Sequence, residues 1–399
     1  MFRKLPEAAV VLYLRDVFES VWHVQDPLVE QDLLDSLRNY LKVQYCFSVS
    51  SGRAALTCIL KALRMLSDKT DVIIPAYTCF SVPSAIVKAG LKVRLCDIKL
   101  ETLDFDYEYL GGIDFRNVLA LVTCNLFGLT CDYKSIQRIA HKERIFVIDD
   151  SAQALGNNLD GRMAGTFGDV GFFSLGKGKN ITTFQGGIIV THHSNIARLI
   201  RGQLAELPSP SLGERMAIFF KLLFYSIFLN PRLYWMVSKM PGVELGVSRF
   251  EPGFAIKKLS AFQAELGKRV LKRLDQYNHL RRRNASRLAE ELRTFREITI
   301  PVNLLDDSVY PLRLPIIVSD PSLRERLYHA LQQSGIAASK MYPTSLDRVH
   351  QLLPHLAQFQ ECPQARFVAD RLLTLPTHPY VQDQDIANIT RVIRGALKS

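Results

Sequence analysis

The sequence predicts an α/β fold, with a mostly parallel sheet in a large domain and a smaller α/β domain at the C-terminal end. Three observations point to it. Short apolar, β-branched runs alternate with helix-like stretches between residues 45 and 200, which is typical of a sheet with helices on both faces. A second, shorter α/β pattern follows residue 259. The 399 residues also exceed the usual size of one compact domain.

The strands of the large domain are expected at continuous apolar runs, because strands buried on both faces have no polar side. The amphipathic segments between several of them are expected to be helices. We expect strands at Tyr45–Val49, Val72–Pro75, Val93–Asp97, Val118–Cys124, Ile145–Asp149, Gly171–Leu175 and Gly187–Thr191, and helices at Ala54–Leu66, Val82–Ala89 and Tyr133–Lys142. Ligands of such sheets bind beyond the carboxyl ends of the strands, so residues that follow the strands are the candidates for chemistry.

Residues 205–258 interrupt this alternation and are predicted to be an apolar connecting segment. Within them, Ala217–Leu229 is almost wholly apolar and is stopped by Asn230 and Pro231. A membrane-spanning helix needs about 20 apolar residues, so this run is too short to cross a bilayer. Three roles stay open for residues 217–236: a subunit contact, a helix lying peripherally on a membrane, or a lid over an apolar substrate.

On either side of this segment, residues 1–204 are predicted to form the large domain and residues 259–399 the smaller one. The smaller domain is expected to contain one long charged helix, a strand and two shorter helices, at Leu259–Leu292, Tyr310–Val318, Ser322–Ser334 and Asp383–Leu397. Gly335 is expected to close the first of the shorter helices, because glycine readily adopts the left-handed C-cap conformation.

The composition excludes several classes of protein. With 48% hydrophobic and 22% charged residues, the chain is expected to be globular rather than disordered. Its seven cysteines have neither a CxxC pair nor the spacing of metal ligands, so we expect reduced thiols and no metal site. The N-terminus lacks the pattern of a secretory signal, which favours a cytoplasmic protein.

The formal net charge is +11, and basic residues cluster in Lys268–Arg273, in Arg281–Arg283 and in the C-terminal tail. A basic surface attracts phosphate-bearing ligands or an anionic membrane surface. No nucleic-acid-binding motif accompanies the charge, so nucleic acid is not an expected partner. Each cluster is alternatively a solvated helix face, where most charge runs lie.

Two motifs at strand ends are candidates for ligand binding. The run Ser50–Ala54 ends a strand and opens a helix, whose first N–H groups can bind a phosphate or can simply be capped by Ser51. A second strand ends in Asp149 and Asp150, and small residues follow. One acid at a strand end often only caps the next helix, but the small residues here leave room for a ligand.

A third motif presents a lysine on a glycine-rich turn. A strand ends near Ser174, and Gly176 and Gly178 flank the turn that carries Lys179. Such a lysine can be solvated or can bind phosphate. A lysine that holds a cofactor as a Schiff base needs a rigid loop, a phosphate anchor and an acid partner for the cofactor ring. The three motifs together supply these parts, which favours an enzyme that uses pyridoxal phosphate (PLP) bound to Lys179.

Several stretches follow the pattern of a known family: Ser51–Leu56, Ile74–Thr78, Asp149–Ala154, Phe173–Leu175 with Lys179, Leu259–Ala264, Met341–Pro343 and Leu375–Pro379. The acid-to-lysine order, the spacing from Ser174 to Lys179 and the glycine pair that follows are jointly specific. In these features the chain, from about residue 28 to 395, resembles the DegT/DnrJ/EryC1/StrS aminotransferases. These are the sugar-aminotransferase branch of the fold-type I PLP enzymes, so the resemblance implies that fold.

The resemblance implies roles for the matching residues. Lys179 forms the internal aldimine with PLP and then moves the proton during catalysis. Asp150 pairs with the pyridinium nitrogen and keeps it protonated, so that the ring can accept electrons. Gln153 lies near the ring and its phenolic oxygen. Lys177 does not match the family position and is interpreted as a loop charge.

The cofactor phosphate is expected between two elements. The resemblance implies that Ser174 holds it together with the backbone N–H groups of Gly52, Arg53 and Ala54. It also implies a homodimer with active sites at the subunit interface.

Three positions depart from the family pattern. Arg53 replaces the usual threonine after the motif glycine. The ring-stacking aromatic aligns with Cys79, so that either Phe80 takes over the stacking or the thiol replaces the aromatic face. The family's Asn-Tyr-Arg, whose asparagine reaches the neighbouring subunit's phosphate, aligns with Ile256–Lys258.

The leading hypothesis for function is a PLP-dependent aminotransferase of sugar or polysaccharide biosynthesis. It would move an amino group from glutamate or glutamine to the keto group of a nucleotide-linked or lipid-linked keto-sugar. One alternative is a PLP-dependent sugar dehydratase, although the dehydratases of the family carry histidine in place of the lysine. Another alternative is a regulatory or scaffold protein that binds PLP without turnover.

Overall fold

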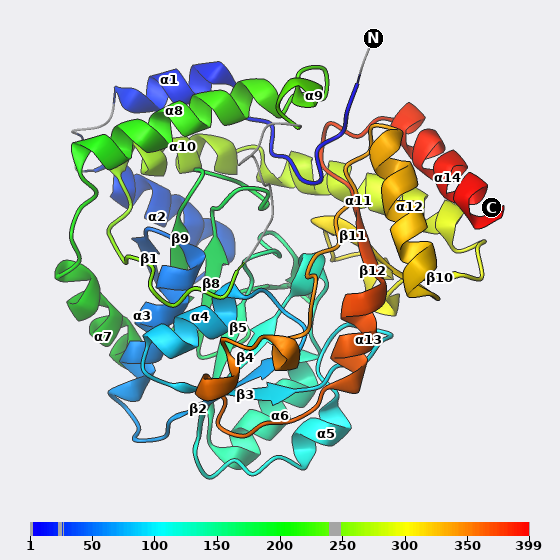
Figure 1. Ribbon diagram of the computed structural model, residues 1–399. Helices are drawn as coiled ribbons and strands as arrows, with labels where there is room; N and C mark the ends of the chain where they lie inside the picture. Colours follow the sequence, from blue (N-terminus) through cyan, green and yellow to red (C-terminus); the bar gives the residue numbers. More distant parts are fainter. Residues whose placement is uncertain (1–2, 23–25, 27, 239–248, 399) are drawn as a thin grey trace.

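The computed structural model describes residues 3–22, 26, 28–238 and 249–398, and it confirms the α/β class (Figure 1). Within these residues the main sheet has seven strands in the order β1-β9-β8-β5-β4-β2-β3. In that order the strands are Tyr45–Val49, Gly187–Thr191, Val170–Ser174, Phe146–Asp150, Val118–Cys124, Asp71–Pro75 and Lys92–Cys96. Only β9 runs against its neighbours in this described sheet, so the sheet is mostly parallel, as predicted.

Helices cover both faces of the main sheet, so successive residues of a strand belong to different apolar cores. In β2, Val72 and Ile74 pack in the core under α3 and α4, whereas Ile73 packs in the core under α5 and α6. This alternation explains the continuous apolar runs in the sequence. The covering helices are α2 (Val29–Leu41), α3 (Gly52–Arg64), α4 (Ser81–Lys88), α5 (Tyr107–Gly111), α6 (Tyr133–Glu143) and α7 (Ser194–Ala205).

The C-terminal part has its own three-stranded antiparallel sheet in the order β10-β11-β12. Its strands are Ile298–Thr299, Arg313–Val318 and Leu372–Pro376, and the helices around it are α11 (Leu274–Leu292), α12 (Pro321–Gln333), α13 (Pro363–Arg371) and α14 (Asp383–Lys398). Gly335 has a φ of +77° and follows α12, which confirms the predicted left-handed C-cap. The N-terminal chain also reaches this part, since Leu5 bridges Ile336.

The prediction of one helix over residues 259–292 was wrong. The chain forms α10 (Ala261–Leu271) and α11, and Arg273 between them has non-helical angles of φ −109° and ψ 2°. The break allows α10 to pack against α1 (Leu14–Val21) and α2 while α11 packs on the small sheet. Neither glycine nor proline marks it, so the sequence gave no local signal.

Three helices form the top of the molecule in Figure 1: α1 (Leu14–Val21), α8 (Leu212–Phe228) and α9 (Tyr234–Val237). The predicted apolar run lies in α8, which begins earlier than its apolar residues because Ser211 and Glu214 form a capping box. Among the described residues, the helices are too short or too polar to cross a membrane. Residues 239–248 of the predicted connecting segment lie outside the described residues.

Candidate active site

A cavity of about 580 Å³ lies at the carboxyl ends of β2, β4, β5 and β8. This is the end of a parallel sheet at which ligands bind. Most of the predicted site residues line this one cavity, namely Gly52, Arg53, Asp150, Gln153, Ser174 and Lys179. Ala54 and Phe80 do not belong to the lining. The structure thus brings together residues that lie up to 127 positions apart in the sequence.

The two consecutive carboxylates of β5 point to different surroundings, because successive side chains of a strand alternate between its faces. Asp149 is fully buried and accepts hydrogen bonds at both carboxylate oxygens. Its donors are the side chains of Asn125, Tyr133 and Ser151 at 2.9 Å each and the backbone N–H groups of Gly165 and Phe167 at 2.8 and 3.2 Å. Asp150 instead lines the cavity and accepts a 3.0 Å bond from the Ala152 N–H. Asp149 therefore stabilises the strand end, and Asp150 is available to a ligand.

Hydrogen bonds with α8 and α11 fix the turn that carries Lys179. Gly178 has a φ of +67°, a left-handed conformation that favours glycine, and its N–H donates to the Tyr225 hydroxyl of α8 at 3.3 Å. From α11, the guanidinium of Arg281 donates to the carbonyl oxygens of Asn180 at 3.0 Å and of Lys179 at 3.4 Å. These contacts fix the direction in which the lysine leaves the backbone.

Arg281 corrects an interpretation made from the sequence. The cluster Arg281–Arg283 was expected to attract anions or to lie on a solvated helix face. Arg281 does neither, because its side chain is fully buried and binds the lysine turn and Asn278. Burial lowers the pKa of this arginine to about 10. No local sequence signal distinguishes it from the arginines that follow.

Burial also shifts the two groups proposed for catalysis, in opposite directions. It raises the pKa of Asp150 to about 7, although the Ala152 N–H and Lys179 favour the charged carboxylate. It lowers the pKa of Lys179, against the attraction of Cys79 and Asp150. In each group burial disfavours the charged form, and a charged ligand group nearby would change both pKa values.

A narrow cradle lies where α3 meets β8. A Cβ atom added at Gly52 would lie 2.9 Å from the Cβ of Ser174, so a larger residue cannot occupy this position without a shift. Ser51 caps the helix by accepting a 3.2 Å bond from the Ala54 N–H. The first N–H groups of α3, at Gly52 and Arg53, adjoin the cavity beside the Ser174 hydroxyl. A helix N-terminus with a hydroxyl beside it suits a phosphate.

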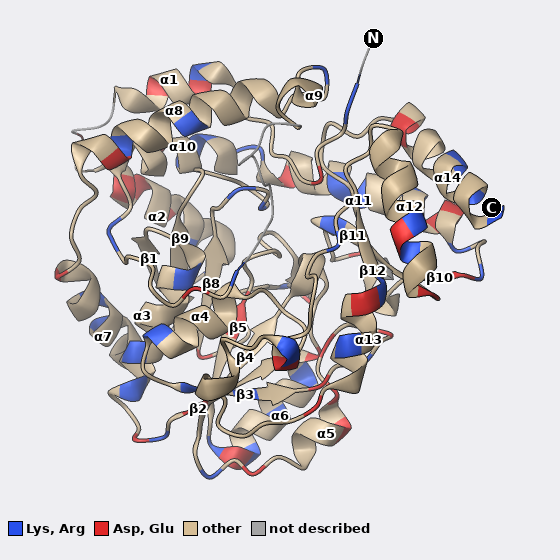
Figure 2. Cartoon of the chain, viewed as in Figure 1, with Lys and Arg blue, Asp and Glu red and all other residues tan. Residues whose placement is uncertain are grey.

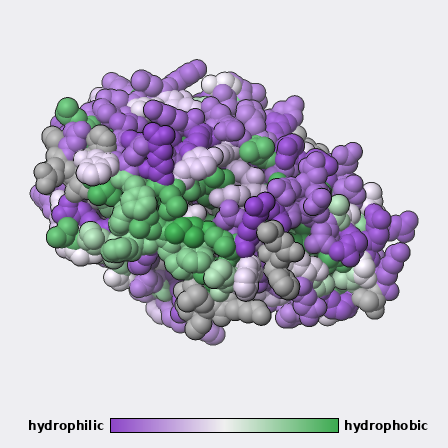
Figure 3. Space-filling view, turned by 90° about the horizontal axis from the view of Figure 1, so that it is seen from above, coloured by the Kyte–Doolittle hydropathy of each residue, from purple (hydrophilic) through white to green (hydrophobic). Residues whose placement is uncertain are grey.

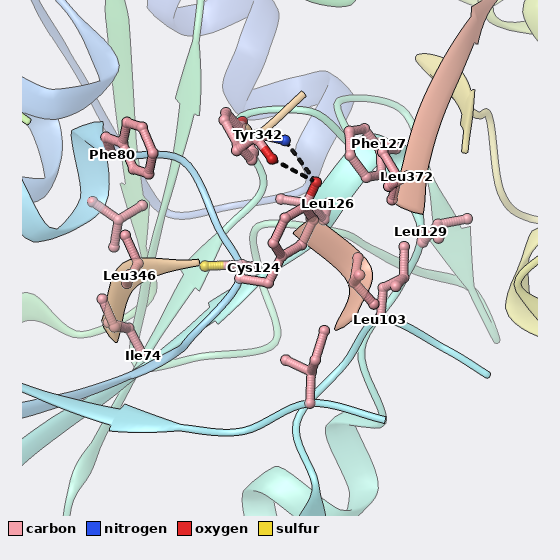
Figure 4. Packing of buried hydrophobic residues seen from close by; sticks show 14 of the residues in the cluster. Ile74, Phe80, Leu103, Cys124, Leu126, Phe127, Leu129, Tyr342, Leu346 and Leu372 are labelled. Atoms are coloured by element: carbon pink, nitrogen blue, oxygen red, sulfur yellow. Dashed lines mark hydrogen bonds between the residues drawn. The ribbon is translucent and has the colours of Figure 1, made fainter. Parts of the chain in front are cut away.

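The aromatic face of the cavity is unusual. Cys79 lines it, whereas Phe80 is buried beside the Tyr342 ring, with 6.0 Å between ring centroids (Figure 4). Tyr342 also lines the cavity, and the Nε2 of Gln153 donates to its hydroxyl at 3.4 Å. Tyr77 fixes this tyrosine by accepting a bond from its backbone N–H at 2.6 Å. Tyr342 belongs to the family-like stretch Met341–Pro343, but the sequence did not predict its place in the cavity lining.

Cations gather at the mouth of the cavity. Arg53, Lys177 and Arg249 belong to its lining, together with Glu251. Arg53 lies 3.3 Å from Glu251 and stacks at 4.5 Å over the Phe254 ring. Partial burial and the neighbouring Lys221 lower the pKa of Lys177. The sequence alone did not predict Arg249 or Glu251, because they lie in the segment interpreted as apolar.

The residues present fit PLP. Gly52 brings the N-terminus of α3 close to Ser174 because it has no side chain. The buried Asp150 carboxylate lacks a cation bonded to it among the described contacts, and the amine of Lys179 belongs to a residue that lines the same cavity. Phosphate anchor, acid and lysine are the three parts that this cofactor requires.

Comparisons with known proteins show the family of this chain. A model of the DegT/DnrJ/EryC1/StrS aminotransferase family matches residues 7–394. The UDP-N-acetyl-3-dehydro-alpha-D-glucosamine 3-aminotransferase of Acidithiobacillus ferrooxidans is 26% identical over 364 residues, which cover 87% of this chain and 83% of the relative. The GDP-4-keto-6-deoxy-D-mannose 3-dehydratase of Yersinia pseudotuberculosis is 25% identical over 314 residues, covering 74% and 72%.

The fold has a matching solved structure in Helicobacter pylori PseC, an aminotransferase involved in the biosynthesis of pseudoaminic acid. It has a TM-score of 0.81 at 17% identity, and the match covers 99% of this chain and 100% of that one. At this identity the likeness shows the fold alone, and it confirms the predicted fold-type I architecture. Because the family model spans nearly the whole chain, this protein belongs to the DegT/DnrJ/EryC1/StrS aminotransferase family.

Proposed function

We propose that this PLP-dependent aminotransferase moves an amino group from glutamate or glutamine to the keto group of a nucleotide-linked keto-sugar. The observation that carries the proposal is the meeting of Lys179 and Asp150 in one cavity at the carboxyl end of the sheet. Neither residue has another evident role there, whereas the neighbouring Asp149 is fully used in holding the fold.

Each residue of the cavity has a proposed task. When bound, PLP would withdraw electrons from the substrate carbon. Asp150 would accept a hydrogen bond from the ring nitrogen, and Gln153 would lie near the ring. Lys179 would carry the cofactor and move the proton at the reacting carbon.

The phosphate of the cofactor is proposed to bind at Ser174 and the first N–H groups of α3, at Gly52 and Arg53. Ala54 is proposed to contribute less, since its N–H donates to the Ser51 side chain. Cys79, rather than Phe80, is proposed to face the ring, because only Cys79 lines the cavity.

The acceptor is proposed to carry a diphosphate. Arg53, Lys177 and Arg249 at the mouth of the cavity offer cations to such a group. The relative from Acidithiobacillus ferrooxidans is named for a UDP-linked dehydro sugar, which supports the same class of acceptor. A lipid-linked keto-sugar would present a diphosphate to the same cations.

A similar protein favours the dehydratase alternative, whereas Lys179 argues against it. The Yersinia pseudotuberculosis relative is a dehydratase. Lys179 argues against this chemistry, because dehydratases that resemble this chain carry histidine at that position.

Three further properties are proposed rather than observed. The chain would form a homodimer, would act in the cytoplasm, and would divide into segments 1–204, 205–258 and 259–399. Sedimentation velocity tests the dimer, and limited proteolysis at the two boundaries tests the division.

The function is tested with purified protein loaded with PLP. Glutamate or glutamine should bleach the visible absorbance band of the lysine-bound cofactor. A nucleotide-linked keto-sugar should restore it and yield an amino sugar by mass spectrometry. A stable band that no donor changes would favour the regulatory alternative, and a deoxygenated sugar as product would favour the dehydratase.

A further inference from the structure

The top of the molecule exposes an apolar surface that the proposed chemistry does not use (Figure 3). We define the apolar face by eleven exposed side chains from α1, α8 and α9 and from the cap residues Trp22 and Leu233. These are Leu14, Phe18, Val21, Trp22, Met216, Phe220, Phe224, Ile227, Leu233, Trp235 and Met236. The two helices α1 and α8 are in contact along this face, where the rings of Phe18 and Phe219 lie 6.0 Å apart. Contiguous apolar surface of this kind marks a binding surface.

The face follows from the sequence of α8. Positions 218, 222 and 225 repeat every three to four residues and are buried against the protein. Positions 216, 220, 224 and 227 repeat in the same way on the opposite side and are also apolar. Phe220 is nevertheless 59% exposed. A helix that is apolar on both sides needs a second apolar environment beyond its own core.

Both tryptophans of the chain lie on this face. Trp22 is 86% exposed and Trp235 is 48% exposed. Tryptophan is enriched at the interface between water and lipid, because its ring is apolar and its N–H is polar. Single exposed apolar residues scattered over a surface are common, but here both tryptophans lie on the same face.

Among the described residues, the carboxylates of α1 and α8 are all in ion pairs, whereas several of the cations on these elements are not. The described carboxylates of α1 and α8 are Asp16, Glu19 and Glu214, and each is in an ion pair with a cation: Arg273, Arg15 together with Arg269, and Lys257 respectively. The same helices and the chain up to α9 also carry Arg215, Lys221 and Arg232 (Figure 2). The excess charge of these elements is therefore positive, which suits an anionic surface.

A second copy of the chain is the less favourable occupant. A two-fold interface places the same patch on both sides. The same positive excess charge would then lie on both sides of the interface, and the carboxylates of these helices are already paired. An anionic bilayer instead offers phosphate groups to the cations and acyl chains to the aromatic rings.

We propose that the apolar face docks on an anionic lipid bilayer, with α8 lying in the plane of the membrane. The inference does not depend on the identity of the acceptor sugar. Because α8 also contacts Gly178 through Tyr225, docking would hold the cavity about one helix diameter, roughly 10 Å, from the lipid. The enzyme would then work beside membrane-bound partners while remaining a peripheral protein.

The test uses the full-length, PLP-loaded protein and extruded vesicles of phosphatidylcholine, with and without phosphatidylglycerol. Flotation measures binding, and brominated lipids test insertion by quenching tryptophan fluorescence. Because both tryptophans lie on the face, quenching reports on this surface alone. We expect binding and quenching with phosphatidylglycerol, and weaker binding without it.

Two variants test the surface itself. Phe220→Ser combined with Phe224→Ser should lower vesicle binding by at least about tenfold while leaving the cofactor band and the melting temperature unchanged. Trp22→Ser should lower flotation as well. The matched control is Phe359→Ser, a 57% exposed apolar residue outside the face, which should bind like the wild type.

Two results would overturn the proposal. One is the absence of flotation and of quenching with either vesicle composition. The other is a double variant that turns a dimer into monomers in sedimentation velocity, while the wild type never binds vesicles. That second result would assign the face to a second copy of the chain.

Discussion

The two sides of α8 have opposite surroundings: titratable groups are buried near its inner side, and apolar rings are exposed on its outer side. On the inner side, Tyr225 contacts the turn beside the buried amine of Lys179 and the carboxylate of Asp150. On the outer side, Phe220 and Phe224 are exposed to water. A buried charge and an exposed apolar ring each cost free energy, the first through desolvation and the second at about 25 cal/mol per Å². A charged ligand in the cavity would lower the first cost, and an apolar partner on the outer side would lower the second. Each side of α8 therefore indicates a binding site.

The largest effect on activity is expected from replacing one of the two lysines of the glycine-rich turn, Lys179, but not the other. Lys179→Ala should abolish the cofactor band and lower transamination by at least about 10⁴-fold, because the carrier and the proton-transfer group are lost together. Lys177→Ala is the matched control and should keep the band and the reaction with glutamate, with a higher KM for the acceptor. Absorbance and steady-state kinetics measure both. Equal losses in the two variants would contradict the assignment.

The adjacent carboxylates should separate catalysis from stability. Asp150→Asn should lower kcat by about 10²–10⁴-fold without lowering the free energy of unfolding. Asp149→Asn should destabilise the fold by about 3–5 kcal/mol, because donors now bonded to both oxygens would meet an amide group. Urea denaturation and kinetics of both variants measure the difference. If the two variants had the same profile, the distinction between them would be wrong.

The pKa of Asp150 predicts a pH dependence of the cofactor-free protein. Burial raises this pKa from 3.8 to about 7, so the folded protein binds more protons than the unfolded chain between these values. The stabilisation is fully present below about pH 4 and is lost as the pH rises through about 7. Relative to Asp150→Asn, the wild type should lose on the order of 4 kcal/mol across this window.

The comparison with Asp150→Asn removes the effect of other groups, among them His378. Burial lowers the pKa of His378 to about 4, so that its contribution to stability is instead lost as the pH falls from 6.5. Urea denaturation at several pH values measures the difference between wild type and variant. A constant difference across the window would mean that Asp150 does not titrate there.

The smallest effect compares the two faces of α8 directly. Leu222 is fully buried, so Leu222→Ala should lower the free energy of unfolding by about 3 kcal/mol. Phe220→Ala removes an exposed ring and should change it by less than about 0.5 kcal/mol. Thermal or urea unfolding without vesicles distinguishes them. A large loss in Phe220→Ala would indicate that the ring is covered in solution by protein.

The sequence by itself determined the alternation of strands and helices, the motifs at the strand ends and the order of acid and lysine. The strands at residues 45–49, 118–124 and 187–191 have the predicted bounds. Three others are shifted by one residue, and the strand predicted at Val72–Pro75 begins one residue earlier, at Asp71. These features are local: apolar periodicity and glycine placement follow from neighbouring residues. The motifs were therefore enough to predict the cofactor and a part of the cavity lining.

Only the tertiary structure decided what the side chains meet. It separated Asp149 from Asp150, placed Cys79 rather than Phe80 in the lining, and brought Arg249 to the mouth of the cavity. It buried Arg281 behind the lysine turn and left Phe220 in water, although the sequence pattern favoured the reverse for residues of these types. The reason is physical: burial and hydrogen bonding depend on segments far apart in the chain, and local patterns contain no information about which segments meet.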